Sequence, residues 1–147
     1  MAFKVLCVDH VGIAVSDLEG KKQMMKNIFG LDPSMPDETV EDQHVTTSFF
    51  KPSTQSEATE LEFLGSTTED GPIARFIAKN GGHDGYQHVA LRVDDITAAL
   101  TELQEKGVAL IDKHWRVGAG GCHIAFLHPK ATGVLIELTE RQGGPSF

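Results

Sequence analysis

The chain contains one pattern twice, and an internal repeat of this size limits the possible folds more than any other feature of the sequence. The first copy reads VDHVGIAVSDL near the N-terminus, and the second reads YQHVALRVDD. Placing His10 over His88 superimposes the apolar residues at alternate positions and puts Asp17 over Asp95. Alternating apolar residues are typical of a half-buried strand. Each copy therefore predicts a strand that carries one histidine.

The same series of elements is predicted after each of these strands. An aspartate is placed to cap a helix, an apolar stripe follows, and Gly30 or Gly107 ends the helix. HVTTSFF and TELEFL predict two further strands in the first copy, with one more short strand in the turn-rich segment before them. In the second copy a short strand in EKGVAL precedes the strands CHIAFLH and GVLIEL. Both copies therefore follow the order βαβββ.

The prediction is an α+β fold of two tandem βαβββ modules that bury a shared core. The whole chain, residues 1–147, is predicted to form a single domain. Its modules span about 3–65 and about 86–140, and the segment GPIARFIAKNGG predicts a linker helix at about 69–82.

Each module also carries one glutamate on its last strand. Glu62 and Glu137 are 75 residues apart, close to the 78 residues that separate His10 from His88. Both glutamates stand among apolar residues, where a buried carboxylate without a partner costs several kcal/mol. Modules related by a pseudo-twofold axis would bring these four side chains to one point.

A divalent cation would offset the burial of both carboxylates and would accept neutral imidazole nitrogen directly. We therefore predict a metal site formed by His10, Glu62, His88 and Glu137, and the alternative is an interior ion-pair or hydrogen-bond cluster. Mixed nitrogen and oxygen ligands suit Co, Ni, Mn, Zn or Fe(II), and they leave positions open for a substrate. Such a site implies Lewis-acid chemistry on a carbonyl compound.

The charge of the chain argues against some partners. The formal net charge is −8, whereas a nucleic-acid binder usually has a basic face.

No apolar run approaches the roughly 18–20 residues that a membrane span needs. Cys7 and Cys122 lack metal-site or short disulfide spacing, and the N-terminus lacks the features of a secretory signal, so a reducing, cytoplasmic location is expected.

A small anionic ligand stays compatible with this charge. Lys113, Arg116 and Lys130 stand close to the glycine-rich stretch GAGG, which lacks the spacing of a dinucleotide fingerprint and the lysine of a phosphate-binding loop. These three residues are either an anion-binding cluster beside a flexible loop or ordinary solvated surface.

Seven segments together resemble the vicinal-oxygen-chelate superfamily, whose paired βαβββ enzymes include glyoxalase I, and most closely its methylmalonyl-CoA epimerase family. They are DHVGIAVSDL, GPIARFIAKNGG, QHVALRVDDI, KGVALIDK, RVGAGG, IAFLHPK and GVLIELTE. The resemblance implies a U-shaped metal-binding cleft, a divalent metal cofactor and a homodimer. It also implies interconversion of (R)- and (S)-methylmalonyl-CoA by proton abstraction next to the thioester, through a metal-stabilised enolate.

The resemblance also assigns roles to individual residues. The metal ligands would be His10, Glu62, His88 and Glu137, and Glu137 would double as one of two acid/base groups. The candidates for the CoA side are Lys113, Arg116, the loop Gly118–Gly121 with Gly120 and Gly121, and Lys130.

The second acid/base group departs from the family pattern. Where the family places a glutamate on a strand of the first module, this sequence has Thr47, which is no base at neutral pH. Glu41, Gln43 or a metal-bound water are possible replacements.

Three other functions remain open. Glyoxalase I would use the same two histidines and two glutamates. An Fe(II) ring-cleaving dioxygenase normally uses two histidines and one carboxylate, and the second carboxylate here speaks against it. A non-catalytic small-molecule-binding protein on the same fold is the third, because fold alone does not decide function.

Overall fold

The computed structural model describes residues 1–142, so the last five residues of the predicted domain, 143–147, lie outside it. The described chain forms two compact units. The first unit consists of residues 10–87, and the second unit consists of residues 1–9 together with the chain from His88 onward. The long strand β1 (Val5–Ala14) contributes its first half to the second unit and its second half, from His10, to the first.

The first unit contains the βαβββ series and the linker helix. Its elements after β1 are α1 (Leu18–Phe29), β2 (Glu38–Val40), the 3₁₀ turn η1 (Glu41–Gln43), β3 (Val45–Phe50), β4 (Glu60–Ser66) and α2 (Pro72–Lys79). The strand order is β2-β3-β4-β1. Strands β2, β3 and β4 pair antiparallel, and β4 pairs parallel with β1. The predicted short strand in the turn-rich segment is β2.

The second unit repeats this arrangement. Its elements are β5 (Gly85–Val93), α3 (Ile96–Glu105), β6 (Arg116–Val117), the 3₁₀ turn η2 (Ala119–Gly121), β7 (His123–Leu127), α4 (Pro129–Thr132) and β8 (Ile136–Glu140). The strand order is β5-β8-β7-β6, with β5 parallel to β8 and the other pairs antiparallel. The prediction of two tandem βαβββ modules is therefore confirmed.

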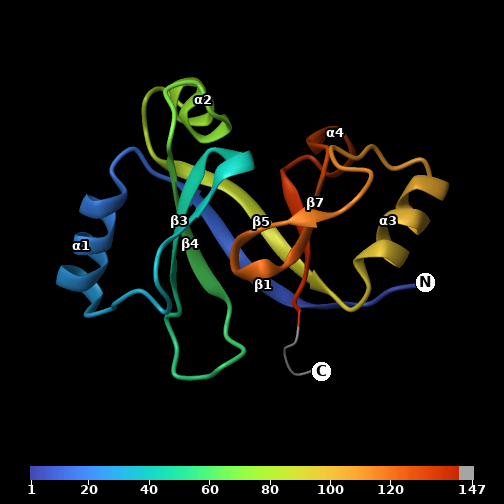
Figure 1. Cartoon of the computed structure of the whole chain (residues 1–147), viewed down its shortest axis with the longest axis horizontal. Helices are drawn as coiled ribbons and strands as arrows, with labels where there is room; N and C mark the ends of the chain where they lie inside the picture. The colour runs from blue at the N-terminus through green and yellow to red at the C-terminus, as the bar shows by residue number, and fades with distance from the viewer. Residues whose placement is uncertain (143–147) are drawn as a thin grey trace. The chain divides into compact units, whose positions relative to one another are not determined.

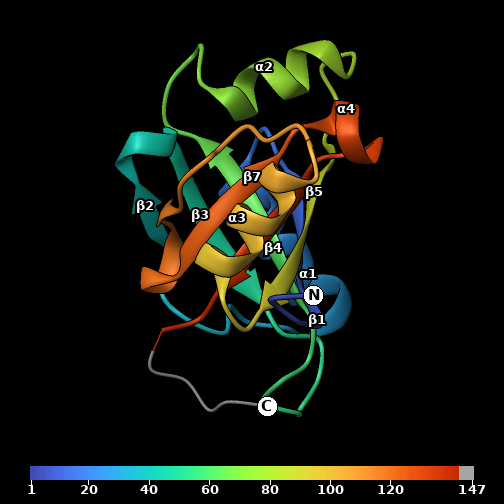
Figure 2. The same cartoon turned by 90° about the vertical axis from the view of Figure 1, so that its right-hand side faces the viewer.

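In each unit one long helix covers one face of the strands, and the histidine lies on the other face. In the first unit α1 packs over Val15, Phe50 and Phe63, beside β3 and β4 (Figure 1). In the second unit α3 packs over Val93 and Leu138, and it crosses β7 in the turned view of Figure 2. Because side chains alternate along a strand, the residues of opposite parity face away from the helix.

The helix ends follow the prediction. Asp17 caps α1 by accepting a hydrogen bond from the Gly20 backbone N–H at 2.9 Å, and Asp95 caps α3 by accepting one from Ala98 at 2.9 Å. Gly30 ends α1 with a φ of 67°, a left-handed conformation that glycine adopts without steric cost. Gly107 follows α3 with a φ of 74°.

One predicted strand is in the wrong place. EKGVAL was expected to begin a short strand, but there only Leu110 forms an isolated bridge, with Leu127. The short strand is β6, because the tight turn Gly118–Gly121 folds Arg116 and Val117 back onto β7.

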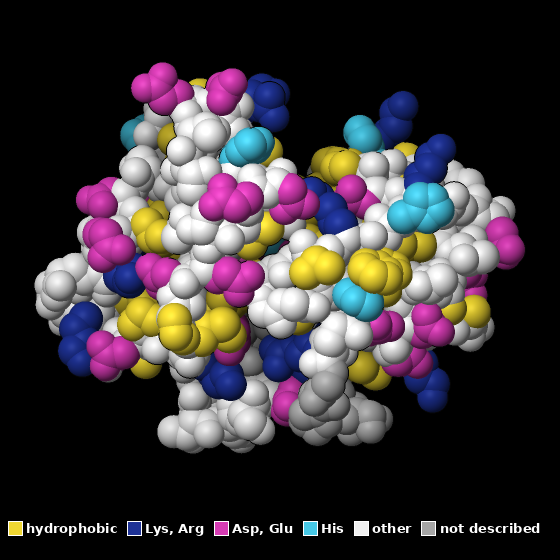
Figure 3. Space-filling model, viewed as in Figure 1, with side chains coloured by type: hydrophobic (Ala, Val, Ile, Leu, Met, Phe, Trp, Pro, Cys, Tyr) yellow, Lys and Arg dark blue, Asp and Glu magenta, His cyan; other side chains and the backbone are white. Residues whose placement is uncertain are grey.

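The surface is mixed in character. Acidic side chains are scattered over the face shown in Figure 3, in keeping with the net charge of −8.

Within residues 1–142, every helix is too short or too polar to cross a membrane.

Candidate functional site

In the first unit, the predicted ligands His10 and Glu62 lie side by side on neighbouring strands. The parallel register of β1 and β4 places Gly12 opposite Glu62, so the glutamate stands two positions along from the histidine, on the same face. The Nε2 atom of His10 lies 3.3 Å from Oε1 of Glu62. Each residue exposes only 5% of its surface.

The second unit repeats this pair with the same register. Ala90, two positions after His88, is opposite Glu137 in the parallel pairing of β5 and β8. The Nε2 atom of His88 lies 2.9 Å from Oε2 of Glu137, and both residues are again 5% exposed. The two copies of the sequence repeat therefore place their histidine and glutamate in the same arrangement, one pair in each unit.

A third member of each set was missed by the sequence analysis. Phe49 on β3 is opposite Glu62, and its ring meets the His10 ring edge to face, with centroids 5.5 Å apart. Phe126 on β7 is opposite Glu137 and meets the His88 ring in the same way at 5.6 Å. The two phenylalanines are 77 residues apart, so the repeat spacing could have identified them.

The chemistry of each pair suits a divalent cation. Each offers one imidazole nitrogen and carboxylate oxygens from a nearly dry environment. A buried carboxylate is stable only with a compensating charge or several hydrogen bonds. The edge-on phenylalanine packs against the imidazole ring and so limits its rotation.

Thr47 lies on the same face of β3 as Phe49, two residues before it. It is 2% exposed, and its Oγ1 has no hydrogen-bond partner within the described part of the chain. Of the replacements suggested for the missing acid/base group, Glu41 is exposed on η1 and Gln43 is half-buried in the same turn. Neither is part of a strand on the His10 face.

The five candidates for binding an anionic ligand lie in separate segments, before and after β7 and on or before β6. Gly120 and Gly121, with φ values of 70° and 75°, form the turn before β7, whereas Lys130 is exposed on α4 after it. A strand of five residues separates them by roughly 15 Å. Lys113 is exposed in the segment before β6.

Arg116 is the candidate that lies close to the histidine of its unit. On β6 it is opposite Ile124, so it shares a face with Phe126. Its guanidinium carbon is 5.9 Å from the centroid of the Phe126 ring, whose edge contacts His88. Its Nε lies 3.6 Å from Oδ1 of Asp112.

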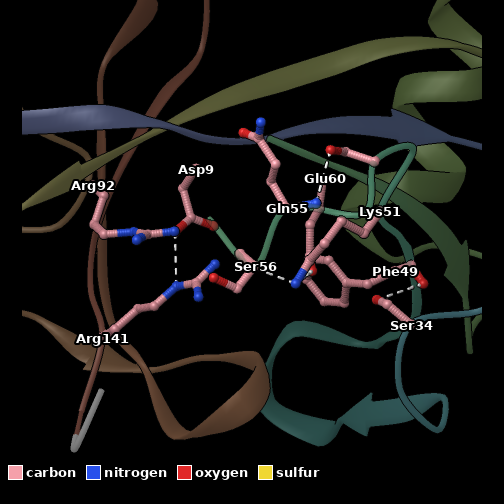
Figure 4. A network of polar contacts seen from close by, with 10 residues as sticks. Asp9, Ser34, Phe49, Lys51, Gln55, Ser56, Glu60, Arg92 and Arg141 are labelled. Carbon is pink, nitrogen blue, oxygen red and sulfur yellow. Dashed lines mark hydrogen bonds and ion pairs between the residues drawn. The ribbon is translucent and has the colours of Figure 1, made fainter. Parts of the chain in front are cut away.

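A buried charged cluster beside β5 was also missed. Arg92 and Arg141 both donate to Oδ2 of Asp9, at 2.8 Å and 3.1 Å (Figure 4). Asp9 and Arg92 are almost fully buried. In the first unit Lys51 contacts the buried Glu60 at 3.7 Å and donates to the Ser56 carbonyl. The register that brings these charges together could not be read from local sequence patterns.

Neither cysteine forms a disulfide within residues 1–142. Burial raises the pKa of the Cys122 thiol above its ordinary value, and the hydrogen bond with Thr139 opposes that rise only in part. A thiol with a raised pKa is a poor nucleophile at neutral pH. Cys122 is therefore not a candidate nucleophile of the second unit.

Comparison with known proteins agrees with this architecture. Residues 9–126 match the model of the Glyoxalase/Bleomycin resistance protein/Dioxygenase superfamily. The chain is 39% identical to the mitochondrial methylmalonyl-CoA epimerase of Dictyostelium discoideum, over 91% of this chain and 78% of that protein. It is 35% identical to the ethylmalonyl-CoA/methylmalonyl-CoA epimerase of Cereibacter sphaeroides, over 90% of this chain and 96% of that one.

A solved structure is similar over nearly the whole length. A variant of Streptomyces coelicolor methylmalonyl-CoA epimerase, in complex with 2-nitronate-propionyl-CoA, superimposes with a TM-score of 0.89. It is 32% identical in sequence, and the match covers 98% of this chain and all of that one. The chain belongs to the Glyoxalase/Bleomycin resistance protein/Dioxygenase superfamily.

Proposed function

We propose that the protein is a metal-dependent epimerase that interconverts (R)- and (S)-methylmalonyl-CoA. The observation that carries the proposal is the repeated set of His, Glu and Phe, with identical register in both units. The similarity to proteins named methylmalonyl-CoA epimerase, at 32–39% identity over most of the chain, supports the choice of substrate.

His10, Glu62, His88 and Glu137 would together hold one divalent ion. When bound, such an ion supplies Lewis acidity that stabilises negative charge developing on a carbonyl oxygen. The donor set suits Co, Ni, Mn, Zn or Fe(II). The burial of both pairs supports this role, because a cation compensates the charge of Glu62 and Glu137.

The reaction inverts one carbon, and the chain must move protons to do so. The carbon that carries the carboxylate and the thioester loses its proton on one face and gains another on the opposite face, so two proton carriers are needed. Glu137 would be one of them, as the family resemblance implies, and its buried carboxylate lies on the face of β8 away from α3.

The acyl-CoA would contact the second unit along β7. Arg116 over Phe126 places a guanidinium on the same face as His88, suited to an anionic group of the substrate. Gly120 and Gly121 before β7, Lys130 after it and Lys113 in the segment before β6 are exposed to solvent, as the extended anionic part of a CoA ester requires. A homodimer in the cytoplasm is proposed by analogy with the family.

The test is an epimerisation assay with purified (S)-methylmalonyl-CoA in D₂O, before and after treatment with a chelator. We expect deuterium at the α-carbon together with the (R) isomer, loss of both on chelation, and recovery when a divalent metal is restored. Turnover of methylglyoxal plus glutathione without epimerisation would favour glyoxalase I instead. A metal-bound protein that does neither reaction would contradict the proposal.

A further inference from the structure

Epimerisation needs a proton carrier on each face of the substrate carbon. Glu137 of the second unit is one candidate, and the family resemblance places the other carrier on a strand of the first unit. This inference rests on the proposed function. Thr47, at the position where a glutamate was expected, is not a base. The second proton carrier is therefore expected among the strand residues of the first unit that share a face with His10.

The register determines which carboxylates lie on that face. Glu60 and Glu62 on β4 are opposite His10 and Gly12. Across the sheet, Phe49 is opposite Glu62, and Thr47 is opposite Leu64. On the next strand, Glu38 is directly opposite Thr47. Among the strand residues of the first unit, Glu38, Glu60 and Glu62 are therefore the carboxylates on this face.

An independent contact supports this assignment. The neighbouring cross-strand pair, Thr39 and Thr46, is joined by a 2.9 Å hydrogen bond between the two hydroxyls. Cross-strand partners in an antiparallel pair project to the same side, and adjacent pairs project to opposite sides. Glu38 and Thr47 therefore project to the His10 face.

Of these three carboxylates, Glu38 lies directly opposite Thr47, the position where the family resemblance places a glutamate. Glu62, 3.3 Å from His10, is a predicted metal ligand, and Glu60 lies opposite His10 itself. Glu38 is half-buried at the start of β2, two strands and two residues away from Glu62, which is roughly 12 Å between the two backbones.

Thr47 lies on β3, between the strands that carry Glu38 and Glu62. Its hydroxyl is buried and has no hydrogen-bond partner within residues 1–142. A buried hydroxyl without a hydrogen-bond partner destabilises the fold, and a bound polar group would remove that cost. This unsatisfied hydroxyl supports the idea that a polar group of the substrate binds beside Glu38. The short Thr47 side chain also leaves space for the longer glutamate of the adjacent strand.

We propose that Glu38 is the second acid/base residue, in place of a glutamate on β3. For one enantiomer, the Glu38 carboxylate accepts the α-proton, and the electron pair of the C–H bond passes into the thioester as an enolate. Protonated Glu137 then donates its proton to the opposite face, where the enolate electron pair forms the new C–H bond. In the reverse direction the two residues exchange roles.

The experiment compares four variants with the unmodified chain by epimerisation rate, α-proton exchange of each enantiomer in D₂O, and bound metal. Glu38→Gln is expected to lower epimerisation at least about 100-fold, the usual size of an acid/base contribution. It should keep its metal and still exchange the α-proton of one enantiomer, which the remaining carrier abstracts. Metal content and one-sided exchange would not persist if the variant were misfolded.

The other variants separate Glu38 from its neighbours. Asp42→Asn removes an exposed charge on η1 and should leave the rate unchanged. Glu41→Gln tests the rival carboxylate and should also be active. Combining Thr47→Glu with Glu38→Gln returns a carboxylate to the same face and should recover at least about tenfold of the lost rate.

Two results would overturn the assignment of Glu38. One is a Glu38→Gln variant within about threefold of the unmodified rate, and the other is a loss confined to Glu41→Gln. If the unmodified, metal-loaded chain shows no epimerisation at all, the proposed function itself fails, and this inference fails with it.

Discussion

The Nε2 atom of His88 lies 2.9 Å from Oε2 of Glu137, and this pair has a counterpart in His10 and Glu62 at 3.3 Å. In both units the residue two positions after the histidine is opposite the glutamate in a parallel strand pair. The two pairs are thus alike in geometry. In the proposed reaction the two pairs have different roles, because only Glu137 is also a proton carrier.

Glutamine substitutions should separate these roles. Glu62→Gln keeps an oxygen donor beside His10, so we expect bound metal and a rate within about tenfold of the unmodified chain. Glu137→Gln removes a proton carrier as well as a charge, so the rate should fall by about 100-fold or more. Metal content and epimerisation rate, measured on the same preparations, check this. Equal losses in both variants would contradict the division of roles.

The edge-on phenylalanines should strengthen metal binding, although neither of them is a predicted metal ligand. Phe126→Leu removes a ring contact worth about 1 kcal/mol, so we expect metal affinity to fall roughly fivefold. Phe49→Leu should lower metal affinity by a similar factor. Phe50→Leu is the matched control, because its ring packs against Phe63 on the α1 face. It should lower stability without changing metal affinity in a competition titration, and a change there would contradict the account.

The buried cluster of Asp9, Arg92 and Arg141 should be important for stability. Asp9→Asn leaves the Arg92 guanidinium buried without its counter-charge, which typically costs about 3–5 kcal/mol. Arg141 is about one third exposed, so Arg141→Gln should cost less than about 1 kcal/mol. Urea unfolding of both variants measures the difference. A cost for Asp9→Asn no larger than that for Arg141→Gln would count against a buried ion pair.

Asp84 should make stability depend on pH. Burial raises the pKa of this carboxyl, but the Ser16 backbone hydrogen bond and the Lys21 ammonium outweigh burial and bring the pKa below its ordinary value of 3.8. A carboxyl with a lowered folded-state pKa stabilises the fold above its unfolded-state pKa and loses that effect as pH falls through the folded-state value.

Asp84→Asn should therefore lower the melting temperature by about 2 °C at pH 7, with the gap to the unmodified chain closing below about pH 4. The exposed Asp70→Asn serves as the control and should show no such gap. A gap for Asp84→Asn that stays constant between pH 7 and pH 3 would be inconsistent with this titration.

The sequence predicted the parts of the fold that local patterns specify. Alternation around His10 and His88, the capping aspartates and the helix-ending glycines all act over a few residues, and the structure confirms them. The short strand was placed wrongly in EKGVAL, because a two-residue strand such as β6 has no periodicity of its own and is set by the turn after it.

The candidate site was likewise predicted only in the parts that short sequence patterns specify. The repeat spacing identified the four predicted ligands, and each histidine does lie beside the glutamate of its own unit. The Phe49 contact, the charges around Asp9 and the position of Glu38 opposite Thr47 depend on strand register, which pairs residues far apart in the chain. Short sequence patterns do not specify that pairing.

The central claim is that the two pairs hold one metal ion between them, and metal analysis of single variants tests it most directly. Purified protein saturated with a divalent metal and then desalted should contain one ion per chain, and His88→Ala and His10→Ala should each contain close to none. The folded state of each variant can be checked by its circular dichroism spectrum. Two ions per chain, or an unchanged metal content in folded His88→Ala, would contradict the account.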